Sequence, residues 1–138
     1  MASGPRLSAP HVIVVDADSK SRTDVATMLV AEGARVTTAD CAGEAVRQVR
    51  AHRFDAAVVD YALPGVGGVV VVAQFRCVGN GRDLPVVMIH GLAPGPERER
   101  AADRISSLPG VEFVARPVTA PALRAAVNGL TADARLSD

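Results

Sequence analysis

The sequence predicts an α/β protein, a three-layer sandwich of helices around a parallel five-stranded sheet with the strand order 2-1-3-4-5. Two observations favour this fold. Five short runs rich in β-branched residues alternate along the chain with stretches of helical spacing, and strands connected in this way run parallel with helices on the faces of the sheet. Three of the runs are apolar at nearly every position, whereas the other two carry charged or hydroxyl side chains.

The predicted strands are HVIVV, ARVTT, AAVV, PVVMI and VEFVA, at residues 11–15, 34–38, 56–59, 85–89 and 111–115. A strand that helices cover on both faces is apolar along its whole length, so the first, third and fourth strands are central. The second and fifth strands contain Arg35, Thr37 and Glu112, as is typical of sheet edges. Right-handed crossovers between parallel strands then favour the order 2-1-3-4-5.

Five helices are expected between and after these strands, because apolar residues recur three or four positions apart. Four apolar faces are Val25, Met28 and Leu29; Ala45, Val46 and Val49; Val69, Val72 and Phe75; and Leu123, Val127 and Leu130. Residues 97–105 form a polar fourth helix, and the third helix is built from poor helix formers. Asp40 is a candidate N-cap of the second helix, and Thr119 lies at the start of the fifth.

Length and composition favour one domain over residues 11–130, with a flexible segment at 1–10 and a flexible tail or linker start at 131–138. Apolar residues make up 49% of the 138 residues, which excludes the signature of disorder. Fifteen basic and fifteen acidic residues cancel, so neither direct nucleic-acid binding nor a membrane surface is expected.

The first ten residues, MASGPRLSAP, contain no apolar stretch, and the most apolar segment, at 69–73, is too short to cross a bilayer. Cys41 and Cys77 have no metal-binding spacing and are expected to be reduced thiols. These features favour a cytoplasmic protein.

Polar residues gather where the predicted strands end. In a parallel sheet of this order, ligands bind beyond the carboxyl ends of the strands, where the winding reverses. Each such residue alone is ordinary for a strand that reaches the surface, but convergence from four strands indicates a site. The residues are Asp16, Ala17 and Asp18 after the first strand, Asp60 at the third, His90 at the fourth, and Arg116 and Pro117 at the fifth.

Four segments extend this pattern: VVDAD at 14–18, FDAAVVDYALPGVGG at 54–68, PVVMIHG at 85–91 and VEFVARPV at 111–118. Together they resemble the receiver domain of two-component response regulators, and the resemblance covers residues 11–130. It implies a flavodoxin-like (βα)5 fold. It also implies a signalling module of a phosphorelay that is not an enzyme.

The resemblance assigns chemistry to particular residues. Asp60 corresponds to the aspartate that accepts a phosphoryl group from a histidine kinase or phosphotransfer protein. Mg²⁺ would be held by Asp16, Asp60 and the backbone carbonyl of Ala62, since hard cations take oxygen ligands. Asp18 is a further candidate ligand. A downstream partner would bind the face formed by the fourth helix, fifth strand and fifth helix, where arginines are available: Arg98, Arg100, Arg104 and Arg124. A homodimer is left open.

Three positions depart from the family. Ala17 stands where the second metal-binding carboxylate is usual, so Mg²⁺ binding is expected to be weak or absent. Arg116 replaces the usual lysine, and its planar fork could reach Asp60 or Asp16 directly. His90 replaces a small hydroxyl residue; either its protonated ring pairs with Asp60 and senses pH, or it is a half-exposed side chain that fills space.

Two more positions belong to the expected phosphoryl pocket and switch. Receivers usually carry a cis peptide bond at the position of Pro117, so one is expected there. Phe113 stands at the position of a rotating aromatic switch, although an ordinary apolar residue on an edge strand is an equally good interpretation.

Two alternatives remain. The first is a phosphorylation-independent protein-interaction module on the same fold. The second is a phosphatase of the haloacid dehalogenase type, with Asp16 as nucleophile and Asp18 as general acid. The second lacks support elsewhere, because Lys20 stands where that family has Thr or Val and the chain has no other lysine.

Overall fold

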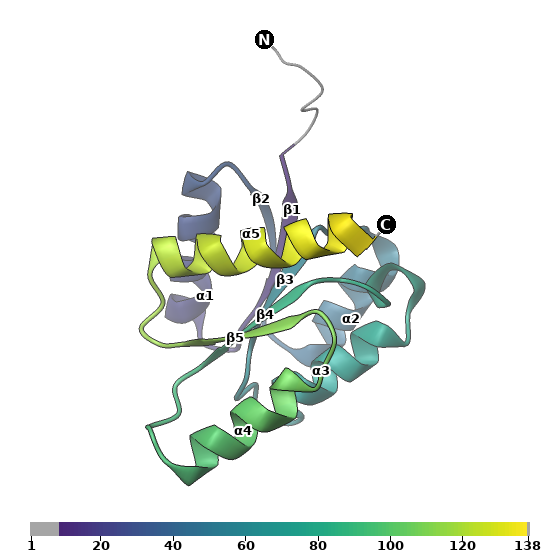
Figure 1. Ribbon diagram of the computed structural model, residues 1–138. Helices are drawn as coiled ribbons and strands as arrows, with labels where there is room; N and C mark the ends of the chain where they lie inside the picture. Colours follow the sequence, from purple (N-terminus) through teal and green to yellow (C-terminus); the bar gives the residue numbers. More distant parts are fainter. Residues whose placement is uncertain (1–8, 138) are drawn as a thin grey trace.

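The protein is a parallel five-stranded sheet with helices on both faces (Figure 1), in a computed structural model that describes the backbone of residues 9–137 and the side chains of residues 9–130. The strands are β1 (His11–Val15), β2 (Arg35–Ala39), β3 (Ala56–Asp60), β4 (Val86–His90) and β5 (Val111–Ala115). The helices are α1 (Ser19–Ala31), α2 (Ala42–Ala51), α3 (Gly67–Arg76), α4 (Pro96–Ser106) and α5 (Ala120–Ser137), with a short 3-10 turn, η1, at Gly79–Gly81. The strand order β2-β1-β3-β4-β5 confirms the prediction.

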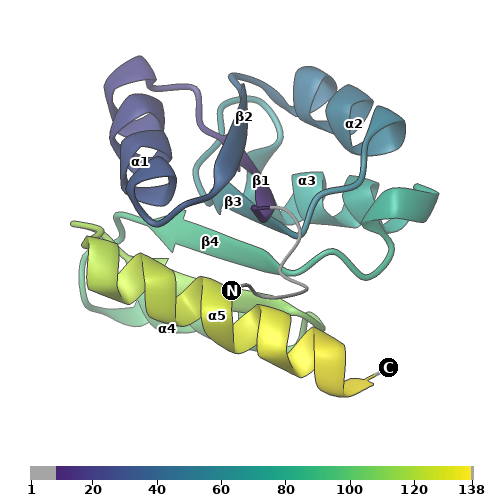
Figure 2. The ribbon, with the colours of Figure 1, turned by 90° about the horizontal axis from the view of Figure 1, so that it is seen from above.

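Alternate residues of the central strands point to opposite faces of the sheet and build two apolar layers. On one face, Val12 and Val14 of β1 pack with residues of α1 and α5. On the other, Ile13 and Val15 pack with residues of α2, α3 and α4. Figure 2 shows α1 and α5 on one side of the sheet and α2 and α3 on the other. Burial on both faces is the reason that the central strands are apolar throughout.

The helix predictions were confirmed in number and order, with two local differences. The third helix forms despite its β-branched run, because Val71, Val72 and Phe75 are buried against the sheet, and this burial outweighs weak intrinsic propensity. Asp40 is not the N-cap of α2: β2 continues to Ala39, so the cap position falls on Cys41, which makes no side-chain cap bond.

The fifth helix reaches Ser137, beyond Leu130, the last apolar residue of its predicted face. Residues 131–137 contain neither proline nor glycine, so nothing in that stretch interrupts the backbone hydrogen bonds of a helix. Its start near Thr119 agrees with the prediction, and the amide of Ala122 donates to the Thr119 hydroxyl there at 3.2 Å. The predicted flexible segment 1–10 lies almost wholly outside the described residues.

Backbone bonds continue past the strand ends and position the residues that follow them. The amide of Asp16 donates to the carbonyl of Ala39, that of Tyr61 to Ile89, and that of Arg116 to His90. The carboxyl ends of all five strands are thereby brought to one edge of the sheet. No helix within the described residues is long and apolar enough to span a membrane.

Candidate functional site

Asp16, Asp60 and Arg116 meet at the carboxyl edge of the sheet, as the sequence predicted. The Nη2 atom of Arg116 lies 3.3 Å from Asp16 Oδ2 and 3.3 Å from Asp60 Oδ1. One guanidinium therefore bridges two carboxylates that come from different strands. The arginine is 100 residues from Asp16 and 56 from Asp60 along the chain, so the contact is made entirely by the tertiary fold.

Asp16 is the most fully bonded member of the site. Its side chain is only 6% exposed. Oδ1 accepts a hydrogen bond from the amide of Asp18 at 3.0 Å, and Oδ2 accepts one from the hydroxyl of Ser21 at 2.5 Å as well as the contact with Arg116. The backbone carbonyl of Asp16 accepts from Arg22 Nη1 at 2.7 Å. A buried carboxylate needs such partners, because an unpaired buried charge is costly.

Asp60 is the last residue of β3 and is held more loosely. Its side chain is 15% exposed, and Oδ1 accepts from the amide of Ala62 at 3.3 Å in addition to the Arg116 contact. The loop after it turns back tightly, so Gly68 packs on the backbone of Asp60. A Cβ atom at position 68 would lie 2.7 Å from the Asp60 carbonyl oxygen, which explains the need for glycine at the end of the YALPGVGG segment.

Arg116 follows β5 and crosses the strand ends toward β1. Its Nη1 atom donates to the Ser21 hydroxyl at 2.8 Å, while Nη2 contacts the two carboxylates. The Arg116–Pro117 peptide bond is cis, as the sequence predicted. Gly91, directly after β4, lies beside the Arg116 stem: a Cβ atom built there would be 3.5 Å from Arg116 Cδ, an ordinary van der Waals contact.

His90, at the end of β4, is buried rather than half-exposed, with 2% of its surface accessible. Its Nδ1 atom accepts a hydrogen bond from the amide of Leu92 at 3.1 Å, so the neutral ring carries its proton on Nε2. Burial lowers the pKa of His90 below its usual value of 6.5, and the positive charges of Arg98 and Arg116 lower it further. These surroundings disfavour the protonated ring that a pair with Asp60 would require.

Phe113 stacks on His90. The ring centroids are 4.1 Å apart with an angle of 23° between the planes, and Tyr61 contacts Phe113 edge-on with ring centroids 5.6 Å apart. The histidine and the two aromatic rings therefore form one continuous cluster across β3, β4 and β5. His90 and Phe113, two of the residues predicted for the phosphoryl pocket and switch, are therefore in direct contact.

The oxygen atoms available to a metal ion are few. Ala17, which follows Asp16, has no ligating atom in its side chain. Asp18 is exposed, and its carboxylate accepts from the amide of Ser21 at 2.8 Å as the N-cap of α1. Within residues 9–130, no three side chains from His, Cys, Asp and Glu form a group that could hold a metal ion.

Two residues of the site were missed by the sequence analysis. Ser21 and Arg22 lie in the first turn of α1, five and six positions after Asp16, and both bind Asp16. Residues in a helix turn that follows a strand can reach back to that strand's end. This spacing was the one available signal, but serine and arginine in a first turn are too common for it to single them out.

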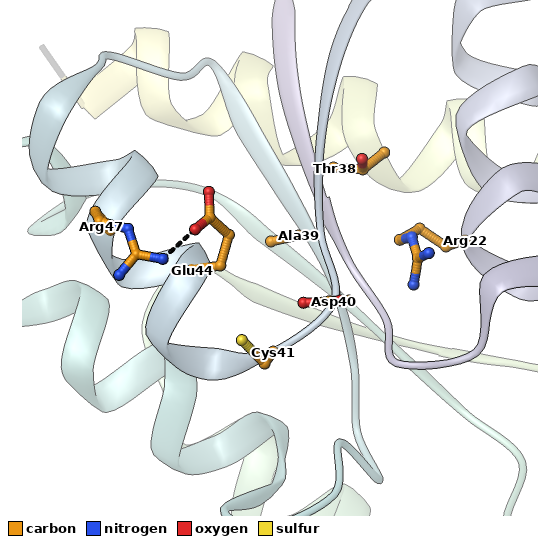
Figure 3. A pocket seen from close by; sticks show the side chains of 7 residues that line it. All are labelled: Arg22, Thr38, Ala39, Asp40, Cys41, Glu44 and Arg47. Atoms are coloured by element: carbon orange, nitrogen blue, oxygen red, sulfur yellow. Dashed lines mark hydrogen bonds and ion pairs between the residues drawn. The ribbon is translucent and has the colours of Figure 1, made fainter.

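A separate hollow of about 380 Å³ lies beside the site, at the end of β2. Its lining is Arg22, Thr38, Ala39, Asp40, Cys41, Glu44 and Arg47. Figure 3 shows Glu44 and Arg47 on one side of the strand end and Arg22 on the other. Glu44 is bonded to Arg47 and Gln48, and Arg22 is bonded to the carbonyl of Asp16. These side chains are therefore engaged with the protein itself.

Comparison with known proteins gives a consistent family. Residues 12–128 match the family model of the response regulator receiver domain. The chain is 32% identical over 126 residues to the transcriptional regulatory protein PrrA of Mycobacterium leprae, covering 90% of this chain and 51% of that protein. It is 25% identical over 123 residues to the cyclic di-GMP phosphodiesterase response regulator RpfG of Xanthomonas campestris pv. campestris, covering 87% and 31%. The chain thus spans about half the length of PrrA.

Solved structures agree on the fold. The receiver domain of the sensor histidine kinase PA1611 from Pseudomonas aeruginosa PAO1, which holds a magnesium ion in its active-site cleft, matches with a TM-score of 0.78 at 23% identity, covering 91% of this chain and 99% of that one. The signal receiver domain of a modulated diguanylate cyclase from Desulfovibrio desulfuricans G20 matches with a TM-score of 0.78 at 26% identity, covering 95% and 100%.

These matches do not support the haloacid dehalogenase alternative, and the structure uses Asp18 as a helix cap. The strand order 2-1-3-4-5 and the family match over residues 12–128 instead agree on the receiver domain. This chain belongs to the response regulator receiver domain family.

Proposed function

We propose that this chain is an atypical receiver module of a two-component phosphorelay, with Asp60 as its candidate phosphoacceptor and a weakened pocket for Mg²⁺ and the phosphoryl group. Receiver domains are signalling modules that interact with histidine kinases or phosphotransfer proteins, and they bind Mg²⁺ in the active site. The observation that carries the proposal is the 3.3 Å approach of Arg116 Nη2 to both Asp16 and Asp60.

The phosphoacceptor assignment is supported by the free oxygen of the Asp60 carboxylate. One carboxylate oxygen of Asp60 would form a bond to phosphorus while the phosphorus–nitrogen bond of a phosphohistidine donor breaks and its electron pair stays on the imidazole. Positive charge must offset the repulsion between the carboxylate and the anionic phosphoryl group. In this chain Arg116 provides that charge at Asp60 Oδ1. The other oxygen, Oδ2, has no hydrogen bond or ion pair from the described residues.

The residues of the pocket do not fit a magnesium ion while Arg116 lies between the carboxylates. Magnesium requires near-octahedral oxygen coordination at short distances. Ala17 supplies no ligand, both oxygens of Asp16 already accept hydrogen bonds, and a fixed guanidinium repels a second cation at the same carboxylates. We therefore derive no step through Mg²⁺, and we expect its affinity for this pocket to be low.

We assign His90, Phe113 and Pro117 to the phosphoryl pocket and its switch region. His90 stacks on Phe113, and Pro117 directly follows the arginine that contacts Asp60. His90 Nδ1 is engaged with the amide of Leu92, so its neutral ring holds the segment after β4 in place. We expect this segment to move less than one that ends in a small hydroxyl residue.

The second candidate function is protein interaction without phosphorylation. It is favoured by the same bridge, because Arg116 places a positive charge beside Asp60 before any phosphoryl group arrives. We place the partner surface on the face formed by α4, β5 and α5. Arg100 and Arg104 are exposed there, whereas Arg124 is bonded to Glu32 at 2.9 Å. The free thiols of Cys41 and Cys77 are in keeping with the cytoplasmic location that we also propose.

Acetyl phosphate with millimolar Mg²⁺ tests the phosphoacceptor directly. Intact-mass spectrometry should detect a small fraction of chains that carry one phosphoryl group, and Asp60→Asn should abolish that fraction. Asp40→Asn is the matched control, because Asp40 is an exposed acid at the end of β2 on the same edge of the sheet; its phosphorylated fraction should equal that of the unaltered chain.

The two candidate functions predict different outcomes. If neither acetyl phosphate nor beryllofluoride modifies Asp60, the phosphoacceptor assignment is wrong. If, in addition, Asp60→Ala binds a histidine-kinase or downstream partner as well as the unaltered chain does, the interaction function replaces it.

A further inference from the structure

The hydroxyl of Ser21 bridges Asp16 and Arg116. Ser21 Oγ lies 2.5 Å from Asp16 Oδ2 and 2.8 Å from Arg116 Nη1. A guanidinium can only donate and an ionised carboxylate can only accept. The single hydroxyl proton of Ser21 must therefore point to Asp16, and its oxygen must accept from Arg116.

The three groups form a closed triangle, since Arg116 Nη2 also contacts Asp16 Oδ2 directly at 3.3 Å. The guanidinium is thus attached through both terminal nitrogens on the β1 side, and through one contact of 3.3 Å to Asp60 on the β3 side. Short hydrogen bonds to charged groups are the strong ones. The guanidinium is therefore held more strongly on the Ser21 side of the bridge than on the Asp60 side.

Ser21 is itself held rigidly. Its backbone amide donates to the Asp18 carboxylate at 2.8 Å, which is the N-cap bond of α1, and the amide of Asp18 donates to Asp16 Oδ1 at 3.0 Å. The helix cap and the pocket therefore share one hydrogen-bonded loop. A hydroxyl on the first turn of α1 is presented to the pocket at a fixed place.

We propose that Ser21 is a positioning residue that holds the Arg116 guanidinium in the place between Asp16 and Asp60 that a divalent cation would otherwise take. The inference rests on the proposed function and deepens it by naming what keeps the metal out. Ser21 weakens metal binding in two ways. It anchors the competing cation, and its proton occupies an oxygen of Asp16 that a metal ion would need.

The test is a magnesium titration of the full chain and three variants by isothermal calorimetry at constant ionic strength. Ser21→Ala removes the hydroxyl and should tighten Mg²⁺ binding about tenfold, an effect typical of losing one hydrogen bond to a charged group. Ser21→Thr restores a hydroxyl and should return the affinity to that of the unaltered chain. Ser19→Ala, at the exposed first residue of α1, is the matched control and should change nothing.

A second readout separates positioning from a general effect on the helix. The guanidinium protons of Arg116 should exchange slowly with water in the unaltered chain and in Ser21→Thr, and fast in Ser21→Ala. An affinity for Mg²⁺ that stays unchanged in Ser21→Ala, or that rises equally in Ser19→Ala, would overturn the inference.

This experiment is independent of phosphoryl transfer. If Ser21→Ala binds Mg²⁺ more tightly but acetyl phosphate never modifies Asp60, the phosphoacceptor role fails and the role of Ser21 stands. If Asp60 is modified but Ser21→Ala has the same Mg²⁺ affinity as the unaltered chain, the role of Ser21 fails and the phosphoacceptor role stands.

Discussion

Asp16 and Asp60 occupy equivalent positions at the ends of neighbouring strands, yet their surroundings differ sharply. Asp16 is buried, and both of its carboxylate oxygens accept hydrogen bonds from close donors. Asp60 is more exposed, and its contacts of 3.3 Å involve a single oxygen. The difference teaches that position in the sheet brings an acid to the site, while the loop and helix that follow it decide how many hydrogen bonds its carboxylate accepts.

The carboxylate on the α1 side of the pocket thus accepts hydrogen bonds on both oxygens, whereas the one on the β3 side accepts them on a single oxygen. The helix after β1 begins within three residues of Asp16 and supplies a cap, a hydroxyl and an arginine. The chain after β3 makes a longer loop before α3 begins at Gly67, and the one bond that loop donates to the Asp60 carboxylate is from Ala62. Two predictions test this contrast, and a third concerns the neighbouring strand end at His90.

The largest effect should follow from giving the α1 side the ligands it lacks. The double variant Ala17→Asp, Arg116→Lys adds a carboxylate next to Asp16 and replaces the bridging fork with a compact point charge. We expect Mg²⁺ affinity to rise about 100-fold, as is typical when a missing oxygen ligand and a competing cation are both corrected.

Calorimetric titration measures that change, with each single variant as a control. Ala17→Asp alone should give a smaller gain, because Arg116 remains in place beside the carboxylates. A double variant that binds Mg²⁺ no better than the unaltered chain would contradict the proposed cause of the weak pocket.

The two acids should also differ in their contribution to stability. Asp16→Asn weakens a buried network and should reduce the free energy of unfolding by about 2 kcal/mol. Asp60→Asn removes one partly exposed ion pair and should cost about 0.5 kcal/mol or less. Urea unfolding monitored by circular dichroism measures both, and equal losses would show that the contrast between the two acids has no energetic counterpart.

The smallest effect concerns His90 and pH. A pKa below 6.5 in the folded protein means that the unfolded chain binds a proton more readily. Stability should therefore fall as the pH drops below 6.5, and the loss should be complete below the folded pKa. His90→Asn keeps an acceptor for the amide of Leu92 but does not titrate, so it should lose less stability between pH 7 and pH 5.

Urea midpoints at both pH values measure this difference. His11 serves as an internal reference because its pKa is also lowered, chiefly by burial, and it is present in both chains. If the two chains lose the same stability on acidification, His90 does not contribute to the pH dependence.

Much of this molecule could be predicted from local patterns. The apolar runs identified the central strands, because a strand buried on both faces is apolar along its whole length. The strands with polar residues were then assigned to the edges of the sheet. The convergence of Asp16, Asp60 and Arg116 also followed, since parallel strands of this order bring their carboxyl ends together. The burial of His90 could not be predicted, because it depends on the stacking of Phe113 from the neighbouring strand.

The sequence by itself determined the order of the elements, the order of the sheet and the set of acids and bases at its edge. Only the tertiary structure decided which atoms bond to which. Ser21 and Arg116 are 95 residues apart, and no pattern in the sequence indicates that their side chains are in contact. A hydrogen bond depends on distances of a few tenths of an ångström, and such distances arise only when α1 and the end of β5 are packed on the same sheet.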